Sequence, residues 1–274
     1  MTPHFWRVPI VGLVLLTGSL AAQEKSVRPD INKPFENPDL KGFLGKFEVE
    51  SREIYSKRQE IVKACKLKPG VAVADIGAGT GLFTRLFAKE VGAEGKVYAV
   101  DVAKTFLDHI DKTCKDQGIK NVSLVQCTQK SCELPANSID VAFVCDTYHH
   151  FEFPFRTLDT LHRALKPGGQ LIVIDFKRIP GVSSEWILGH VRAGQEVFTK
   201  EIVESGFKQV EEVPLLKENY VLRFEKRVRP APGKSVGVPL IGFGVAGVWC
   251  PSERCLIGTT LVVVTSRPIN NMRH

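Results

Sequence analysis

Short apolar runs alternate with amphipathic stretches through the middle of the chain. The apolar runs are rich in Val, Ile and Ala, and the stretches between them repeat their apolar residues at helical spacing. The apolar runs are VAVADI, KVYAVD, VSLVQ, IDVAFVCD and QLIVIDF. Strands that are apolar on both sides belong to a parallel sheet with helices on both faces. The pattern therefore predicts successive βαβ units.

The region after QLIVIDF has a different pattern. A helical stretch, EVFTKEIVESG, precedes two strand-like segments, FKQVEEV and NYVLRFEK, with no clear helix between them. We expect these two segments to close the sheet as an antiparallel hairpin. The predicted fold class is α/β, a doubly wound, mostly parallel seven-stranded sheet. The KPG sequence at Lys166 to Gly168 is expected to end a helix just before a strand.

The first 22 residues have the order of a secretory signal peptide. Arg7 precedes an apolar stretch, and Ser19 and Ala21 suit cleavage before Ala22. We expect an exported protein, periplasmic or secreted, with no stable membrane span after cleavage. The alternative is that the segment stays uncleaved and anchors the chain to the membrane.

Three further regions follow the leader. Residues 23–40 are rich in Pro, Asn and charge and predict an extended linker. Residues 41–228 carry the alternating pattern and form the expected domain. Residues 229–274 are poor in charge and dotted with Gly and Pro. A docked hairpin, a poorly ordered tail and a translation-frame artefact all remain open for this last region.

Composition narrows the choice of partners. The net charge is +7, from 37 basic and 30 acidic residues, but the charges are interspersed and form no basic block. We therefore expect no nucleic-acid partner. The seven cysteines include no CxxC pair, and four residues separate Cys127 from Cys132 and Cys250 from Cys255. That spacing predicts neither a disulfide framework nor a metal site.

The stretch VADIGAGTGLFTRLF carries the most chemical information. Asp75 ends a strand, and a glycine-rich turn then opens a helix, where close backbone approach and free N–H groups suit a nucleotide-like cofactor. The glycines are Gly77, Gly79 and Gly81. A dinucleotide fingerprint needs its third glycine where Leu82 stands, so the spacing disfavours an NAD-dependent oxidoreductase. Asp101 closes the next strand, where a carboxylate accepts hydrogen bonds from ribose hydroxyls.

With these residues in register, the chain closely resembles the class I S-adenosylmethionine-dependent methyltransferases of type 11. The resemblance covers roughly Phe47 to Lys226 and rests on four motifs. They are VADIGAGTGLFT, VYAVD, ELPANSIDVAFVCDTYHHF and LHRALKPGGQLIVIDF. The resemblance implies the fold predicted above, S-adenosylmethionine as cofactor and a methyl acceptor as substrate.

The resemblance also assigns cofactor-binding residues. Asp75 and the glycines would hold the methionine part, and Asp101 the ribose. Asp146 or Cys145, after the fourth strand, would support the methionine end, and Ser131 would act through its backbone. The position that usually carries an acid facing the adenine holds Lys130.

Three residues after the fourth strand are candidates for the chemistry. His149 and His150 lie at a carboxyl strand end, where such sheets place their sites, and are the candidate general bases for a hydroxyl or carbon-acid acceptor. Tyr148 would orient the acceptor or face the sulfonium by cation–π attraction. The alternative for the histidines is a packing role.

Two other sets of polar residues are candidates for the site. The alternative for both sets is that they form a solvated surface. The segment KFEVESREIYSKRQEIVKAC predicts an amphipathic helix, and the resemblance implies that this helix covers the cofactor. Its pocket candidates are Glu50, Arg52, Tyr55 and Arg58. After the fifth strand, where acceptors usually approach such sheets, stand Asp175, Lys177 and Arg178.

The predicted function is S-adenosylmethionine-dependent methylation of a small molecule. DTYH replaces the N/D-P-P-Y turn that is typical of enzymes methylating amino groups in nucleic-acid bases or glutamine. A non-catalytic or vestigial cofactor-binding domain is the alternative. Two observations keep this alternative open. Lys130 replaces the acid expected to face the adenine, and an exported protein is separated from the cytosol, where S-adenosylmethionine is made. The acceptor and the oligomeric state are not predicted.

Overall fold

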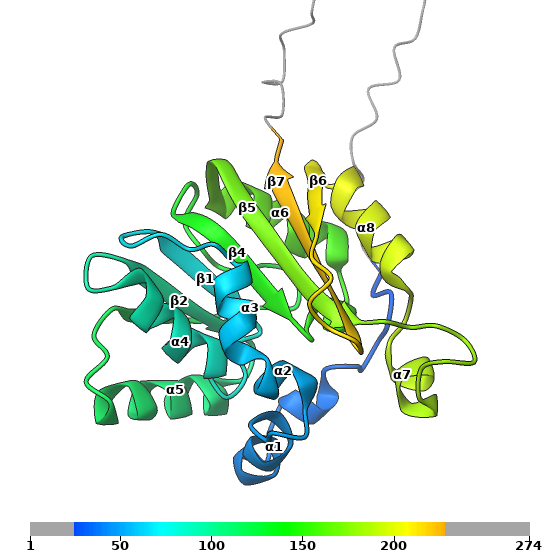
Figure 1. The fold of residues 1–274 in the computed structure, drawn as a ribbon, viewed down its shortest axis with the longest axis horizontal. Helices are drawn as coiled ribbons and strands as arrows, with labels where there is room; N and C mark the ends of the chain where they lie inside the picture. Colours follow the sequence, from blue (N-terminus) through cyan, green and yellow to red (C-terminus); the bar gives the residue numbers. More distant parts are fainter. Residues whose placement is uncertain (1–24, 228–274) are drawn as a thin grey trace, which may run out of the picture. The chain divides into compact units, whose positions relative to one another are not determined.

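A computed structural model describes residues 25–227 (Figure 1). The expected leader, residues 1–22, and the expected tail, residues 229–274, lie outside these described residues. The central sheet has seven strands in the order β3-β2-β1-β4-β5-β7-β6. The strands are β1 (Ala72–Ile76), β2 (Lys96–Asp101), β3 (Val122–Gln126), β4 (Ile139–Cys145), β5 (Leu165–Phe176), β6 (Phe207–Glu212) and β7 (Asn219–Lys226). Strands β1 to β5 pair in parallel, while β7 pairs antiparallel with both β5 and β6, which confirms the predicted fold class and the closing hairpin.

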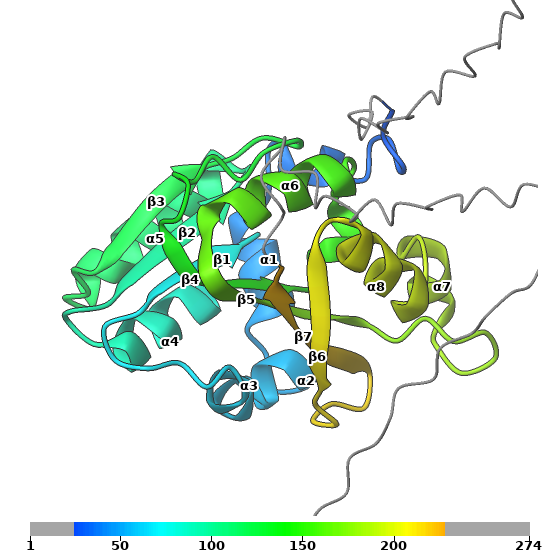
Figure 2. The same cartoon turned by 90° about the horizontal axis from the view of Figure 1, so that it is seen from above.

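Helices cover both faces of the sheet, and Figure 2 shows α3 and α4 on one side of the strands with α6 on the other. The α-helices are α1 (Leu40–Phe47), α2 (Glu53–Ser56), α3 (Arg58–Ala64), α4 (Leu82–Val91), α5 (Lys104–Asp116), α6 (Pro154–Ala164), α7 (Glu185–His190) and α8 (Gln195–Glu204). Two short 3-10 helices add η1 (Lys33–Phe35) and η2 (Tyr148–His150). Within residues 25–227, no helix is long and apolar enough to cross a bilayer.

Alternate strand residues feed two separate cores. Val73 and Phe143 pack with the apolar faces of α2, α3 and α4, whereas Ala74 and Val144 pack with α6 and α8. Because successive side chains of a strand point to opposite faces, continuous apolar runs are required here. This is the physical reason that the strands could be recognised from sequence.

The sheet order reverses between β1 and β4, and this switch point locates the site. Strands β1, β2, β4 and β5 all end at one edge of the sheet, where η1, α1, α2 and α7 also gather (Figure 1). In open α/β sheets, ligands bind in the crevice outside such strand ends.

The segment expected to be a linker packs on the domain instead, as far as the described residues 25–40 show. Ile31 and Asn32 are buried, and the Asn32 side chain donates hydrogen bonds to Gln129 Oε1 at 2.7 Å and to the His150 carbonyl at 2.9 Å. The Pro- and Asn-rich composition correctly indicated irregular backbone. It carried no information on burial, because burial depends on distant partners.

Two local expectations also differ from the structure. The amphipathic stretch before β1 is divided among α1, α2 and α3, because Val49 to Arg52 turn the chain. The KPG sequence lies inside β5 rather than before it. Helix α6 ends at Ala164, Leu165 already pairs with Ile139, and the register shifts across the KPG segment.

Candidate functional site

A cavity of about 590 Å³ opens at the switch point. Its wall combines the turn after β1, the ends of β2 and β4, and residues 127–129 and 131–132. Segments from before β1 and from α7 complete it. A volume of this size suits a small-molecule ligand. The cavity therefore brings together segments that are far apart in sequence.

The glycine-rich turn forms the floor of the cavity. Gly77 has a φ of +71°, and a Cβ at this position would lie 2.3 Å from Thr147 Cγ2, so the backbone crosses close to the β4 end. Gly79 has a φ of +53°, but its nearest neighbour would be a Phe47 ring carbon at 3.7 Å. Gly81 precedes α4 as its N-cap. A side chain at position 79 would consequently project into the cavity.

Asp75 is buried under this turn and lines the cavity. Its Oδ2 accepts a 2.6 Å hydrogen bond from Thr84 Oγ1 at the start of α4. Burial raises the pKa of Asp75 to about 6, against the opposing effect of the Thr84 hydrogen bond. Asp75 thus ties the strand to the helix and places a carboxylate of unusual proton affinity beside the cavity.

Asp101, at the end of β2, anchors the other side of the turn. Its Oδ2 accepts a 2.9 Å hydrogen bond from Gly79 N, and its Oδ1 accepts a 2.8 Å bond from Ala103 N. Burial raises its pKa, and these backbone bonds oppose the rise. The carboxylate lines the cavity with its position fixed by the glycine turn.

Asp146 follows β4 in a left-handed conformation with φ +46°. It forms an ion pair with Arg52 and accepts a 2.6 Å hydrogen bond from Asn219 Nδ2. Burial raises the pKa of Asp146, and Arg52 opposes that rise. The Arg52 guanidinium also lies 5.1 Å from the centroid of the Phe47 ring, so a residue from before β1 is locked over the end of β4.

Aromatic rings from η1, α1 and α5 cover the cavity. Phe43 lies 5.2 Å from Phe35, 5.2 Å from Phe47 and 5.5 Å from Phe106, between ring centroids. Phe35 also meets the His150 ring edge-on at 5.2 Å. These contacts give the cavity an apolar wall that suits a flat, uncharged ring.

The loop before β4 supplies Ser131, which lines the cavity as expected. Its carbonyl accepts a 3.0 Å hydrogen bond from Thr128 N, and its Oγ accepts from Glu133 N. Lys130 is not among the lining residues, because its Nζ lies 4.6 Å from the centroid of the Phe153 ring. The side chain that replaces the expected acid therefore does not obstruct the cavity.

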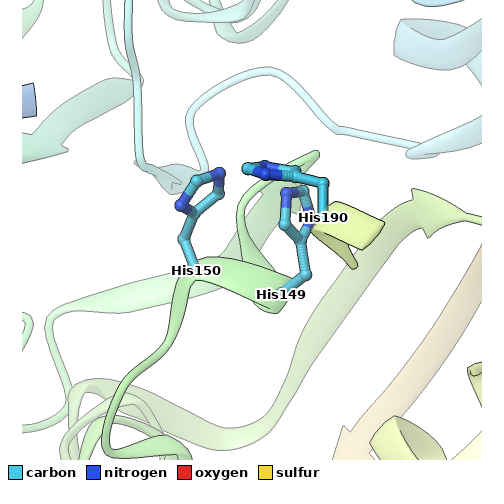
Figure 3. A group of neighbouring side chains, drawn as sticks. All are labelled: His149, His150 and His190. Atoms are coloured by element: carbon cyan, nitrogen blue, oxygen red, sulfur yellow. The ribbon is translucent and has the colours of Figure 1, made fainter. Parts of the chain in front are cut away.

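His149 and His150 both line the cavity, and a third histidine, His190 of α7, joins them (Figure 3). His149 is buried, and its Nδ1 lies 2.8 Å from Asp175 Oδ1. Asp175 also accepts hydrogen bonds from the backbone N–H groups of His149 and Phe176. A carboxylate held in this way fixes the His149 ring with its Nε2 available.

Tyr148, expected to face the acceptor, points into the core and does not line the cavity. It is fully buried, and its hydroxyl donates a 3.0 Å hydrogen bond to Glu201 Oε2. Its ring packs on Phe151 and Phe198. The turn of η2 explains the difference, because neighbouring residues of a 3-10 helix project in different directions.

The three candidates after the fifth strand differ in their surroundings. Asp175 is buried against His149, but Lys177 donates to the Leu216 carbonyl at 2.9 Å and Arg178 donates to the carbonyls of Val191 and Leu188. Arg178 therefore holds α7 in place instead of facing an acceptor.

In the segment before β1, only Arg52 of the four candidates lines the cavity. Arg58 pairs with exposed Glu50 at 3.1 Å and stacks on Tyr55. These residues form a charged surface turn, as the alternative expectation stated.

Among the lining residues that sequence reasoning missed, four come from segments without a motif. They are Asn32, Phe35, Trp186 and His190. The first two lie in the supposed linker, and the last two lie on a short helix with no motif around it. The only sequence signal for them was the presence of aromatic and histidine side chains in otherwise polar segments.

Comparison with known proteins places this geometry in a family. A family described as "Methyltransferase domain" matches residues 73–169. The ubiquinone/menaquinone biosynthesis C-methyltransferase UbiE of Burkholderia vietnamiensis is 31% identical over 118 residues, covering 43% of this chain and 48% of the relative. UbiE of Shewanella frigidimarina is 26% identical over 183 residues, covering 56% of this chain and 73% of the relative. The chain spans about half the length of several curated relatives it matches.

Solved structures agree on the fold. A SAM-dependent methyltransferase from Aquifex aeolicus has a TM-score of 0.62 and 25% identity, covering 69% of this chain and 99% of that one. The [4+2]-cyclase SpnF has a TM-score of 0.56 at 17% identity, covering 64% of this chain and 83% of that one, and this likeness shows the fold alone. Taken with the cavity and its carboxylates, the matched family and these neighbours show that the chain contains a class I S-adenosylmethionine-dependent methyltransferase domain.

Proposed function

We propose that this protein transfers a methyl group from S-adenosylmethionine to a small molecule. The observation that carries the proposal is the meeting of two features in one cavity. The glycine turn with Asp101 lies on one side, and the His149–Asp175 pair lies on the other. The first feature suits a cofactor with a ribose, and the second suits removal of a proton from an acceptor.

The residues present fit S-adenosylmethionine. Gly79 leaves space where a Cβ would project, and the Phe35–Phe43–Phe106 wall suits the adenine. Asp101 would hold the ribose, Ser131 would contact the adenine side through its backbone, and Asp75, Asp146 and the glycine turn would hold the methionine end. When bound, the cofactor supplies an electrophilic methyl group on a sulfonium ion, and buried carboxylates favour that positive charge.

His149 is the proposed general base. Asp175 holds its Nδ1, so the Nε2 lone pair can take a proton from a hydroxyl or a carbon acid. The relatives named C-methyltransferases support an acceptor of this kind. Most of the remaining rate enhancement would come from positioning and from water exclusion by the aromatic cover.

The non-catalytic alternative loses one of its two supports. Lys130 turns toward Phe153 and leaves the cavity open, so the missing acid does not block a cofactor. The other support is export, which we propose on the pattern of residues 1–22 alone. Intact mass of the protein from its native host would test it: a chain beginning near Ala22 is expected, and a retained Met1 or Thr2 contradicts cleavage.

Titration calorimetry tests the cofactor. The purified protein should bind S-adenosylmethionine and S-adenosylhomocysteine, and it should not bind NAD. Incubation with methyl-labelled donor and a metabolite extract should then label a small molecule. Cofactor binding without any labelled product would favour a non-catalytic domain, and NAD binding in place of S-adenosylmethionine would overturn the proposal.

A further inference from the structure

Three histidine rings converge in the acceptor side of the cavity. His149 and His150 come from η2, and His190 comes from α7, as Figure 3 shows. The ring centroids lie 4.3 Å apart for His149 and His150, 5.1 Å for His149 and His190, and 5.2 Å for His150 and His190. One nitrogen from each ring lies within 4.8 Å of the other two.

Two of the three rings have a nitrogen without a hydrogen-bond partner among the described residues. Asp175 occupies Nδ1 of His149 and so directs the Nε2 atom outward. The Nδ1 atom of His150 is buried and has no hydrogen-bond partner among the described residues. A buried nitrogen without a partner costs free energy, so a packing role alone leaves this atom unexplained.

Two charged groups lie near the three rings. Arg28, whose Nη2 donates to the Gly189 carbonyl at 2.8 Å, is the nearby cation that opposes a metal charge, while Asp175 favours it.

We propose that His149, His150 and His190 bind a divalent transition metal of the zinc class. Three imidazole ligands with one open position are the donor set of catalytic zinc sites. The Asp175–His149 contact reproduces the carboxylate that orients a ligating histidine in such sites. Because zinc–nitrogen bonds are about 2.0 to 2.1 Å long, each ring would have to shift inward by at most about 1 Å.

The open position faces the cavity, because all three histidines line it. Resting on the proposed methyltransferase function, the metal would bind an oxygen of the acceptor and lower the pKa of its hydroxyl, which then loses its proton to water. With the metal bound, His149 would be a metal ligand and would no longer act as the general base. The metal would then activate the acceptor in its place. The spacing of the cysteines gave no indication of this site, and the sequence predicted no metal.

Cobalt(II) titration of the untagged protein tests the proposal. After chelator treatment and dialysis, the protein should bind one equivalent of Co²⁺ with the intense visible absorption of a four-coordinate site, and Zn²⁺ should displace it. His190→Ala should weaken Co²⁺ binding at least about tenfold, and Asp175→Asn about 10- to 100-fold. His109→Ala, which changes a histidine outside the cavity wall, should bind as the unaltered protein does.

The outcomes separate this proposal from the methyltransferase function. Calorimetry with S-adenosylmethionine should give similar affinities for the unaltered protein and for His190→Ala, which also shows that the variant folds. No Co²⁺ absorption in the unaltered protein, or equal binding by His190→Ala, would overturn the metal site while leaving cofactor binding intact. Added azide should change the Co²⁺ spectrum, and an unchanged spectrum would overturn the open position.

Discussion

The two halves of the cavity are built in different ways. The cofactor half consists of Asp75 to Gly81 and Asp101, which lie in one βαβ unit, and hydrogen bonds between these neighbours hold it together. The acceptor half consists of His149, His150 and His190, with Asp175 behind His149, and Asn32 from before the domain pattern donates to the His150 carbonyl. A local motif thus makes one half, and long-range packing makes the other.

This difference also separates two kinds of role. The cofactor half presents glycines and carboxylates whose positions the backbone dictates. The acceptor half presents His149 and His150 from η2 and His190 from α7, and Arg178 ties α7 to the sheet through the carbonyls of Leu188 and Val191. Substitutions in the first half should therefore change cofactor affinity, and substitutions in the second should change turnover or metal binding.

The largest expected effect is in the cofactor half. Gly79→Val should abolish detectable S-adenosylmethionine binding in calorimetry, because the side chain would fill the cavity floor. Gly92→Val is the matched control, since Gly92 has a similar positive φ of +70° but open space around it and no place in the cavity wall. Normal binding by Gly79→Val, or lost binding by both variants, would contradict the assignment of the turn.

The acceptor half should respond in turnover. His149→Asn keeps a donor near the Nδ1 position for Asp175 and removes Nε2, so methyl transfer should fall by about 100- to 10,000-fold with cofactor affinity nearly unchanged. Labelled-methyl incorporation and calorimetry measure the two quantities. His190→Ala sharpens the test: a comparable loss supports the metal, whereas unaltered turnover leaves His149 as a base alone.

Asp75 should make stability depend on pH. Its folded pKa of about 6 exceeds the ordinary value of 3.8, so the folded state binds more protons and the free energy of unfolding falls as pH rises from about 4 to 6. Asp75→Asn should remove this loss and raise stability at pH 7 by up to about 3 kcal/mol, in chemical denaturation. Asp111→Asn is the control, because Asp111 forms an exposed ion pair with Lys115, and it should change the free energy of unfolding at pH 7 by less than about 1 kcal/mol. The gain in stability of Asp75→Asn over the unaltered chain should be larger at pH 7 than at pH 4. An equal gain at the two pH values would contradict the raised pKa of Asp75.

Asp101→Asn should weaken S-adenosylmethionine by roughly 1 to 3 kcal/mol, or about 5- to 150-fold. The substitution removes the charge but keeps one carbonyl oxygen for the backbone N–H of Gly79 or Ala103. Calorimetry provides the measurement. An unchanged dissociation constant would show that the cofactor's ribose does not contact this carboxylate.

The smallest expected effect comes from the segment before the domain pattern. A chain that begins at residue 36 should bind S-adenosylmethionine roughly tenfold more weakly than one that begins at residue 25, because Asn32 and the Phe35 ring are lost from the wall. Equal affinities would mean that residues 25–35 cover the cavity without contacting the cofactor.

Several features of the site followed from local sequence. The sequence predicted Asp75, Gly77, Gly79 and Asp101, which all line the cavity, because a strand, a tight turn and a helix start impose residue types at fixed spacing. His149 and His150 followed from their place after the fourth strand. Tyr148 was misplaced in the same motif, because the sequence located η2 at the strand end but not the direction of each side chain.

The sequence by itself determined the mostly parallel sheet, its closing hairpin and the glycine turn with its carboxylates, since periodicity of 2 and 3.6 residues and turn chemistry act over a few positions. The tertiary structure alone decided that Asn32 and Phe35 belong to the site, that Tyr148 pairs with Glu201, and that His190 joins the other two histidines. These contacts join residues that are distant in the chain, and only the packing of helices on the sheet brings them within reach of one another.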